Sequence, residues 1–149
     1  MKHYRKSFTM LALFLLLSLA FTGLASADVL HGKGWLRAKG SGVATLHMTG
    51  HVEINGHGVG VVYIHGAEKI VASGHGKRLD YGRTTVFHGY QGTINVTGER
   101  MVVKMVGGKI DFFARGKGTA ILRGRGMYET GGGSGDWAPD GLTLEVVED

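Results

Sequence analysis

The chain has 149 residues, but it contains no cysteine and only one proline, Pro139. The absence of cysteine excludes disulfide bonds and any lipid anchor attached to a cysteine. Stability must therefore come from side-chain packing and backbone pairing, which a fold of this size can supply.

The N-terminal segment has the three parts of a secretory signal peptide. A basic region over residues 2–6 precedes an apolar run over residues 8–25, which ends at the small-residue site Ala25-Ser26-Ala27. We expect cleavage after Ala27 and export to the periplasm or the extracellular space. The alternative is a retained membrane anchor, for which the apolar run is barely long enough.

The expected exported chain has little net charge. Three of the 17 basic residues precede the cleavage site, which leaves 14 against 12 acidic residues. This balance of about +2 does not favour a nucleic-acid-binding protein, since such domains carry a strong basic excess.

Glycine is abundant, with 27 residues, and its positions follow a two-residue rhythm. Between residues 30 and 129, nineteen glycines occupy even positions and two, Gly89 and Gly107, occupy odd positions. Most other even positions are apolar, whereas most charged residues are odd. Side chains alternate between the two faces of a β-strand, so this sorting predicts strands with the even positions inside.

A second rhythm has a period of eight residues. Glycine recurs from Gly34 to Gly82 at this interval, and again, after a shift of two, from Gly108 to Gly132. Short strands at regular spacing indicate an all-β protein. We expect one rolled, mostly antiparallel, barrel-like sheet of about eight to twelve short strands, with a β-solenoid as the alternative.

The chain then divides into a signal peptide (1–27), a glycine-rich β domain (28–130) and a closing segment (131–149) with a turn and a final strand. Trp137, in the closing segment, is expected to plug the barrel or to cover a sheet edge.

Some even positions are charged and interrupt the pattern. We interpret most of them as turn positions. They are Glu68, Arg78, Asp80, Arg100 and Lys104. Lys104 lies inside the apolar segment 101–106, whose odd residues Met101, Val103 and Met105 would face outward. This strand is expected to be covered on both faces.

The chain resembles small exported glycine-rich β-repeat proteins of prokaryotes. The similarity covers residues 30–142 and includes the closing motif Arg123-Gly124-Arg125-Gly126-Met127-Tyr128. The family has no established activity, so the resemblance implies no functional residue.

The basic stretch 115–125 invites two familiar interpretations, and neither fits. The segment "GKGT" lacks the spacing and the following helix of a phosphate-binding loop. The segment "RGRG" lies in a strand pattern, unlike the disordered arginine–glycine segments that bind RNA. We therefore expect no specific nucleic-acid partner.

Five cations in this region are candidates for binding anions, because all occupy odd, outward positions. They are Lys109, Arg115, Lys117, Arg123 and Arg125. If the eight-residue repeats, or octads, align across neighbouring strands, Lys109, Lys117 and Arg125 form one row, and Arg115 and Arg123 form another. Such a patch would attract an anionic polymer, lipid headgroups or an envelope glycan. The alternative is an ordinary solvated face.

Histidine is the other unusual polar residue. The candidate ligands for Zn²⁺ or Cu²⁺ are His47, His51, His57, His65 and His75, which share the outward face. Stacked octads would bring some imidazoles within reach of one metal ion. The alternative is a scatter of surface histidines.

No catalytic motif is evident, because the serines lack a nucleophile-elbow context and the carboxylates are dispersed. The outward charges also exclude a transmembrane barrel. The sequence predicts an exported, non-catalytic β domain with a structural or binding role in the cell envelope. The alternative is a periplasmic histidine-rich metal binder.

Overall fold

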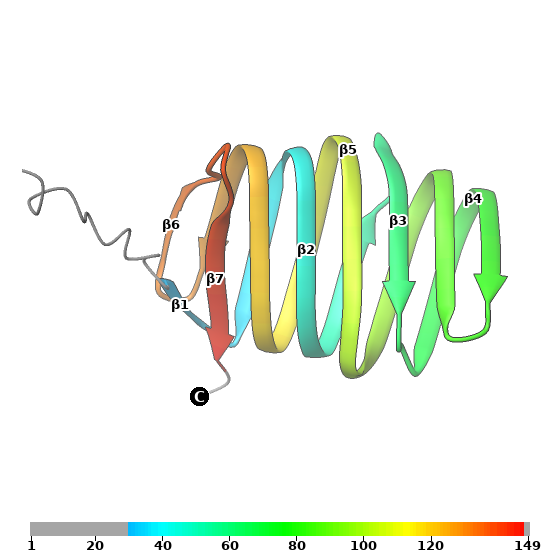
Figure 1. Cartoon of the computed structure of the whole chain (residues 1–149), viewed down its shortest axis with the longest axis horizontal. Helices are drawn as coiled ribbons and strands as arrows, with labels where there is room; N and C mark the ends of the chain where they lie inside the picture. The colour runs from blue at the N-terminus through cyan, green and yellow to red at the C-terminus, as the bar shows by residue number, and fades with distance from the viewer. Residues whose placement is uncertain (1–29, 148–149) are drawn as a thin grey trace, which may run out of the picture.

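A computed structural model describes residues 30–147, which form one sheet without any helix (Figure 1). The predicted signal peptide lies outside the described residues. The strands are β1 (Leu30–Lys33), β2 (Trp35–Asn55), β3 (Val59–His65), β4 (Lys69–Tyr81), β5 (Thr84–Thr130), β6 (Gly133–Asp136) and β7 (Leu142–Val147). All pairs are antiparallel except β1 with β7. The all-β class and the mostly antiparallel sheet are confirmed.

The chain is a long hairpin that winds around its own core. The outgoing arm runs from β2 to β4, turns at Gly82-Arg83, and returns as β5. β5 lies on both sides of β2. Where a β2 residue has two partners in β5, these partners lie 16 to 18 residues apart in the sequence. One turn of the coil therefore takes about two octads, and the turns lie side by side in Figure 1.

Two strands are much longer than we expected, with 21 residues in β2 and 47 in β5. Glycines allow these strands to bend without ending. At the corners glycine pairs with glycine, as Gly42 does with Gly107 and Gly124, and Gly50 with Gly98 and Gly116. A Cβ at Gly124 would overlap the carbonyl oxygen of Ser41 on the neighbouring strand. The octads therefore mark bends in continuous strands rather than separate strands.

The core follows the predicted alternation along β2, where Leu36, Leu46 and Ile54 are fully buried. In β3 the odd-numbered Val59 is buried as well, because the pairing shifts between Val59 and Val61.

The return arm departs from the predicted alternation. Gly50 pairs with Gly98, and Met48 pairs with Met101. A step of two residues along β2 therefore matches a step of three residues along β5. This extra residue is a β-bulge, and it moves the following side chains to the other face.

The expectation for residues 101–106 is therefore wrong. Met101, Val103 and Met105 are fully buried, and Lys104 is exposed. A second extra residue between Gly107 and Ile110 restores even positions to the inside. The strand has one buried face, and it is not covered on both sides.

The two-residue turn at Gly82-Arg83 pairs even residues of β4 with odd residues of β5, so the odd-numbered Phe87 is buried. A third extra residue, between His88 and Gln91, returns even positions to the inside. Glu68 does lie in a turn between β3 and β4, as expected. Arg78 and Asp80 do not, because they lie within β4 and pair with Phe87 and Thr85. They share the inner face with these residues at the last turn of the coil, where no further turn covers the core.

The sheet does not close on itself, so neither the barrel-like form nor the solenoid is confirmed. Near the opposite end of the coil, Trp137 is buried, and its Nε1 donates a hydrogen bond to the Met127 carbonyl, 3.1 Å away. Its ring covers the backbone at Gly40. Within residues 30–147 there is no helix of the length and apolarity needed to cross a bilayer.

Candidate functional site

The candidate site is a groove at one corner of the coil, where glycine leaves the backbone without side chains. Gly40 pairs with Gly126 and Ile110, and the Lys109 N–H donates to the Gly58 carbonyl, 3.2 Å away. Four neighbouring passes of the chain thus meet at this corner. Lysine, arginine and histidine side chains stand on either side of the bare backbone.

The groove has a volume of about 620 Å³. Its polar side chains come from Lys39, Ser41, Asn55, His57, Lys109, Asp111 and Arg125. Lys39 Nζ lies 3.4 Å from Asp111 Oδ2, so this pair is internally neutralised. Lys109 and Arg125 are exposed and have no ion pair among the described residues. They supply the net positive charge of the groove.

His57 is held at the groove by its own neighbourhood. Its backbone N–H and its Nδ1 both bond to Asn55 Oδ1, at 3.2 and 2.9 Å. Because Oδ1 accepts both bonds, Nδ1 acts as a donor. The orientation of the imidazole is therefore fixed by a contact within the loop between β2 and β3.

The corner continues beyond the groove along the coil. The Gly56 N–H donates to the Gly92 carbonyl, 2.7 Å away, and Gly74 pairs with Gly92. His75 and Lys77 follow Gly74 on β4. Basic side chains thus recur along this corner from Arg125 to the last turn of the coil.

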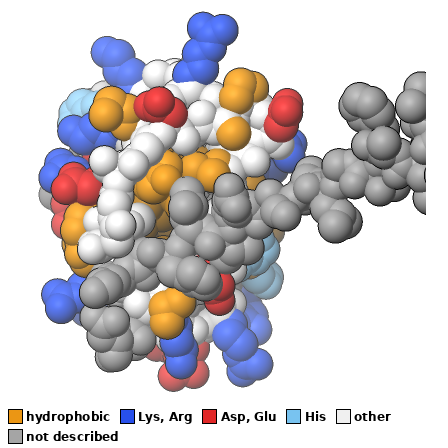
Figure 2. Space-filling view, turned by 90° about the vertical axis from the view of Figure 1, so that its left-hand side faces the viewer, with side chains coloured by type: hydrophobic (Ala, Val, Ile, Leu, Met, Phe, Trp, Pro, Cys, Tyr) orange, Lys and Arg blue, Asp and Glu red, His pale blue; other side chains and the backbone are white. Residues whose placement is uncertain are grey.

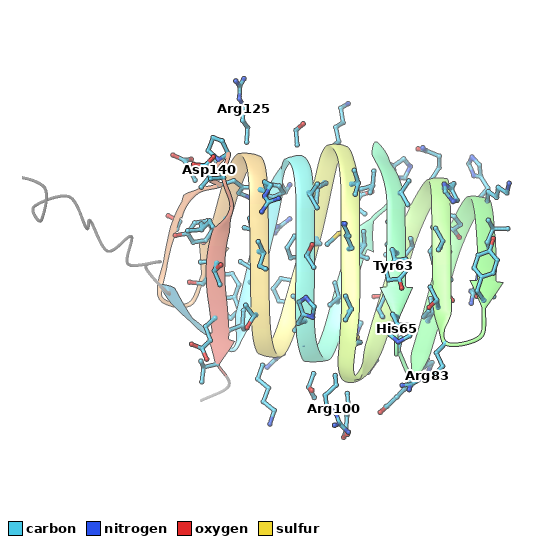
Figure 3. The ribbon with its side chains drawn as sticks, in the orientation of Figure 1. Tyr63, His65, Arg83, Arg100, Arg125 and Asp140 are labelled. Carbon is cyan, nitrogen blue, oxygen red and sulfur yellow. The ribbon has the colours of Figure 1, made fainter. Side chains whose placement is uncertain are left out.

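The five predicted cations do not form the expected rows. Arg123 and Arg125 flank Gly124, and Lys109 follows Gly107 and Gly108, at the corner of the groove. Arg115 and Lys117 flank Gly116, which belongs to the opposite corner. In Figure 3, Arg125 and Arg100 mark these two edges.

The expected rows do not form because one turn of the coil takes about two octads. One octad is half a turn, so residues eight apart face opposite edges, while residues sixteen apart align. Lys109 and Arg125 are sixteen apart and share the groove. Lys117 instead borders a smaller groove of about 260 Å³ with Arg100 and His47. Figure 2, an end-on view, shows Lys and Arg side chains at both edges.

The five candidate histidines are exposed or half-exposed, and three of them, His51, His57 and His65, each bond to one polar neighbour. His51 Nδ1 lies 3.2 Å from Thr97 Oγ1, and His65 Nδ1 lies 2.8 Å from Thr84 Oγ1. Among residues 30–147, no three His, Asp or Glu side chains come together as a metal site would require. Zinc or copper binding by His47 and His75, or by the other candidates, stays a prediction.

Sequence reasoning missed Lys39, Ser41 and Asn55 as groove residues. A signal for them exists in the glycine positions, which mirror each other about the hairpin tip: Gly42 pairs with Gly124, Gly50 with Gly116 and Gly74 with Gly92. The same mirror places Ser41 opposite Arg125.

The resemblance to exported glycine-rich proteins also stays a prediction. Comparison of the chain with protein-family models, curated proteins and solved structures found no significant match.

Proposed function

We propose that the chain is an exported, non-catalytic domain of the cell envelope that binds a linear anionic polymer along the corner of the groove. The observation that supports this most directly is the convergence of Lys109 and Arg125, from two turns of β5, on one open groove. Neither cation is neutralised by a described carboxylate. Cations that converge on an open groove attract phosphate or carboxylate groups by charge.

A polymer fits this surface better than a small anion. Adjacent passes of the sheet lie about 4.8 Å apart, so Arg125 and Lys109, on either side of β2, recur at roughly 10 Å along the coil. His57 and then Lys77 extend the series in the same direction. An extended chain of anions that lies across the strands meets these residues in turn. Because the turns stack along the coil and the sheet does not close on itself, this proposal favours the solenoid-like description.

The test compares matched variants at the two corners. A chain of residues 28–149 contains the whole sheet, since every buried core side chain lies between Leu36 and Val146. Its affinity for long-chain inorganic polyphosphate is measured by calorimetry at two salt concentrations, with neutral dextran as the control polymer. Lys109→Ala and Arg125→Ala should each weaken binding roughly fivefold, since an exposed ion pair contributes up to about 1 kcal/mol.

The matched controls are Arg115→Ala and Lys117→Ala at the opposite corner, which should change the affinity less than twofold. Equal losses at the two corners would mean diffuse charge attraction and would contradict the groove. If the groove variants weaken binding to anionic vesicles but leave polyphosphate binding unchanged, the ligand is a lipid headgroup and the polymer proposal is wrong.

A further inference from the structure

The two broad outer faces of the coil differ in chemistry. The face that contains β3 is made by residues 43–47, 61–65, 77–81, 84–88, 102–106 and 119–123, and we call it the β3 face. Paired residues on neighbouring strands share a face. Tyr63 pairs with Lys104 and Val86, and Lys104 pairs with Thr45, so these side chains form one row across the sheet. Figure 3 shows Tyr63 on the face turned toward the viewer.

Each of the six segments of the β3 face presents at least one aliphatic residue or tyrosine outward. Tyr63, Val106 and Tyr81 are 38, 39 and 62% exposed. The charged residues that these segments present outward are Lys77, Lys104 and Arg123. The carboxylate within these segments, Asp80, lies on the inner face beside Thr85 and pairs with Arg78. Glu145 lies on β7, beside Thr119 at one end of the face.

The opposite face has a different composition. Arg37 pairs there with Phe113 and Glu129, and Phe113 also pairs with Glu53. Charges of both signs alternate across this face, as is usual for a solvated sheet surface. Both faces expose large apolar side chains, with Val71, Phe113 and Met127 on the opposite face. The β3 face differs in that the outward charges of its six segments are all positive.

We propose that the β3 face docks on an anionic lipid surface. In this docking, the outward aliphatic side chains of the β3 face lie at the boundary between the lipid headgroups and the acyl chains. Tyrosine and lysine have apolar bodies and polar tips, which suit the headgroup layer. Lys77, Lys104 and Arg123 complement anionic headgroups. Asp80, the carboxylate in the six segments, is on the inner face and is paired with Arg78. This docking goes beyond polymer binding, since it centres on Lys104 and shares with the groove corner only the flanking cations Lys77 and Arg123.

A second copy of the chain fits this face less well. Six strand segments and β7 span roughly 29 Å, and five residues of strand roughly 17 Å, which gives about 500 Å² per copy. Two such faces bury about 1,000 Å², below the range of about 1,200–2,000 Å² for stable interfaces. Stacking two copies would also bring Lys104 against a surface of like charge.

The first experiment measures co-sedimentation of the 28–149 chain with phosphatidylcholine vesicles that contain phosphatidylglycerol. Lys104→Glu should reduce the partition coefficient at least fivefold, because it reverses a charge at the centre of the face. Lys69→Glu, the same change at an exposed site on the opposite face, should reduce it less than twofold. Equal reductions, or no sedimentation of the unaltered chain, would overturn the proposal. Lys109→Ala should bind these vesicles normally, which separates this test from polymer binding.

The second experiment locates the contact. The chain has no cysteine, so Val106→Cys and Ser73→Cys each allow a single polarity-sensitive label, one on the β3 face and one on the opposite face. Anionic vesicles should shift the emission of the Val106 label to the blue and leave the Ser73 label unchanged. A shift at Val106 that depends on protein concentration without vesicles would instead identify a second copy as the occupant. That outcome, or equal shifts at both sites, would contradict lipid docking.

Discussion

Lys104 illustrates how one inserted residue decides the environment of a whole segment. Its even position predicts an inward side chain, but the β-bulge at Glu99-Arg100 reverses the alternation. Arg100 adopts a φ of 51°, in the left-handed region. The bulge is the physical reason that Met101, Val103 and Met105 reach the core while Lys104 stays in water.

Adjacent substitutions test this reversal. Met105→Ala should lower the free energy of unfolding by about 2–4 kcal/mol, because it leaves a cavity in a fully buried site. Val106→Ala, on the exposed face, should cost less than about 1 kcal/mol. Urea denaturation measures both changes. A larger loss of stability at Val106 than at Met105 would mean that even positions face inward in this segment, as the sequence alternation predicts.

Asp80 is the described carboxylate with the most strongly bonded setting. Thr85 Oγ1 donates to its Oδ1 at 2.6 Å, and Arg78 donates from Nε and Nη2 at 3.1–3.2 Å. The bond from Thr85 and then the bond from Arg78 hold the pKa of Asp80 below its ordinary value of 3.8. Arg78 also lies over the Phe87 ring, 5.5 Å from its centre. These polar side chains cover the end of the core.

The lowered pKa has a consequence for stability at acid pH. A carboxylate with a lowered pKa stabilises the fold fully above its unfolded value, and the contribution is lost as the pH falls through the folded value. Asp80→Asn should therefore be less stable than the unaltered chain near neutral pH, and the difference should narrow below pH 3.8. Urea midpoints between pH 2.5 and 7 measure this. A difference that is constant across that range would assign the loss to packing.

At the level of the strand, glycine determines where the sheet bends. The corners bring two backbones so close that a Cβ has no room, and Gly124, with a φ of 128°, also has a backbone conformation unsuited to other residues. This constraint explains why glycine recurs every eight residues. It also explains why β2 and β5 continue through their corners.

Two glycines at the same corner separate close contact from simple flexibility. Gly124→Ala should lower the free energy of unfolding by more than about 2 kcal/mol or prevent folding, because the new Cβ overlaps the Ser41 carbonyl. Gly108→Ala should be neutral or slightly stabilising, since nothing lies within 4 Å of its Cβ position. Thermal melts monitored by circular dichroism measure both. If both substitutions lower the stability equally, the corners require the backbone flexibility of glycine and not the space left by its missing side chain.

The order of the strands also decides which cations meet. Residues one octad apart lie on opposite edges of the coil, so the predicted row of Lys109, Lys117 and Arg125 does not form. Lys109 and Arg125 meet because β5 completes a turn between them. Their convergence depends on the pitch of the coil, which no short motif encodes.

The whole molecule is held together mainly by contacts that are distant in the sequence. Trp35 pairs with Arg115, whereas local pairing is found at the hairpin tip, where Tyr81 pairs with Thr84, and between β5 and β6, where Thr130 pairs with Gly133. Proteins dominated by such pairing fold slowly, because loop closure precedes most of the stabilising contacts.

Refolding of the 28–149 chain should therefore take milliseconds to seconds at 25 °C. Stopped-flow fluorescence can follow it, since Trp137 is buried in the folded chain. Refolding within tens of microseconds would contradict a fold built from pairing between distant turns.

The alternation of side chains by itself determined the all-β class, the inward glycines and most of the core, because strand geometry places every second residue on one face. It also placed all five candidate cations on the outside. The tertiary structure decided the length of the strands, the three bulges and the meeting of Lys109 with Arg125 and His57. These depend on how many residues complete a turn around the core, which is set by packing between chain segments far apart in the sequence.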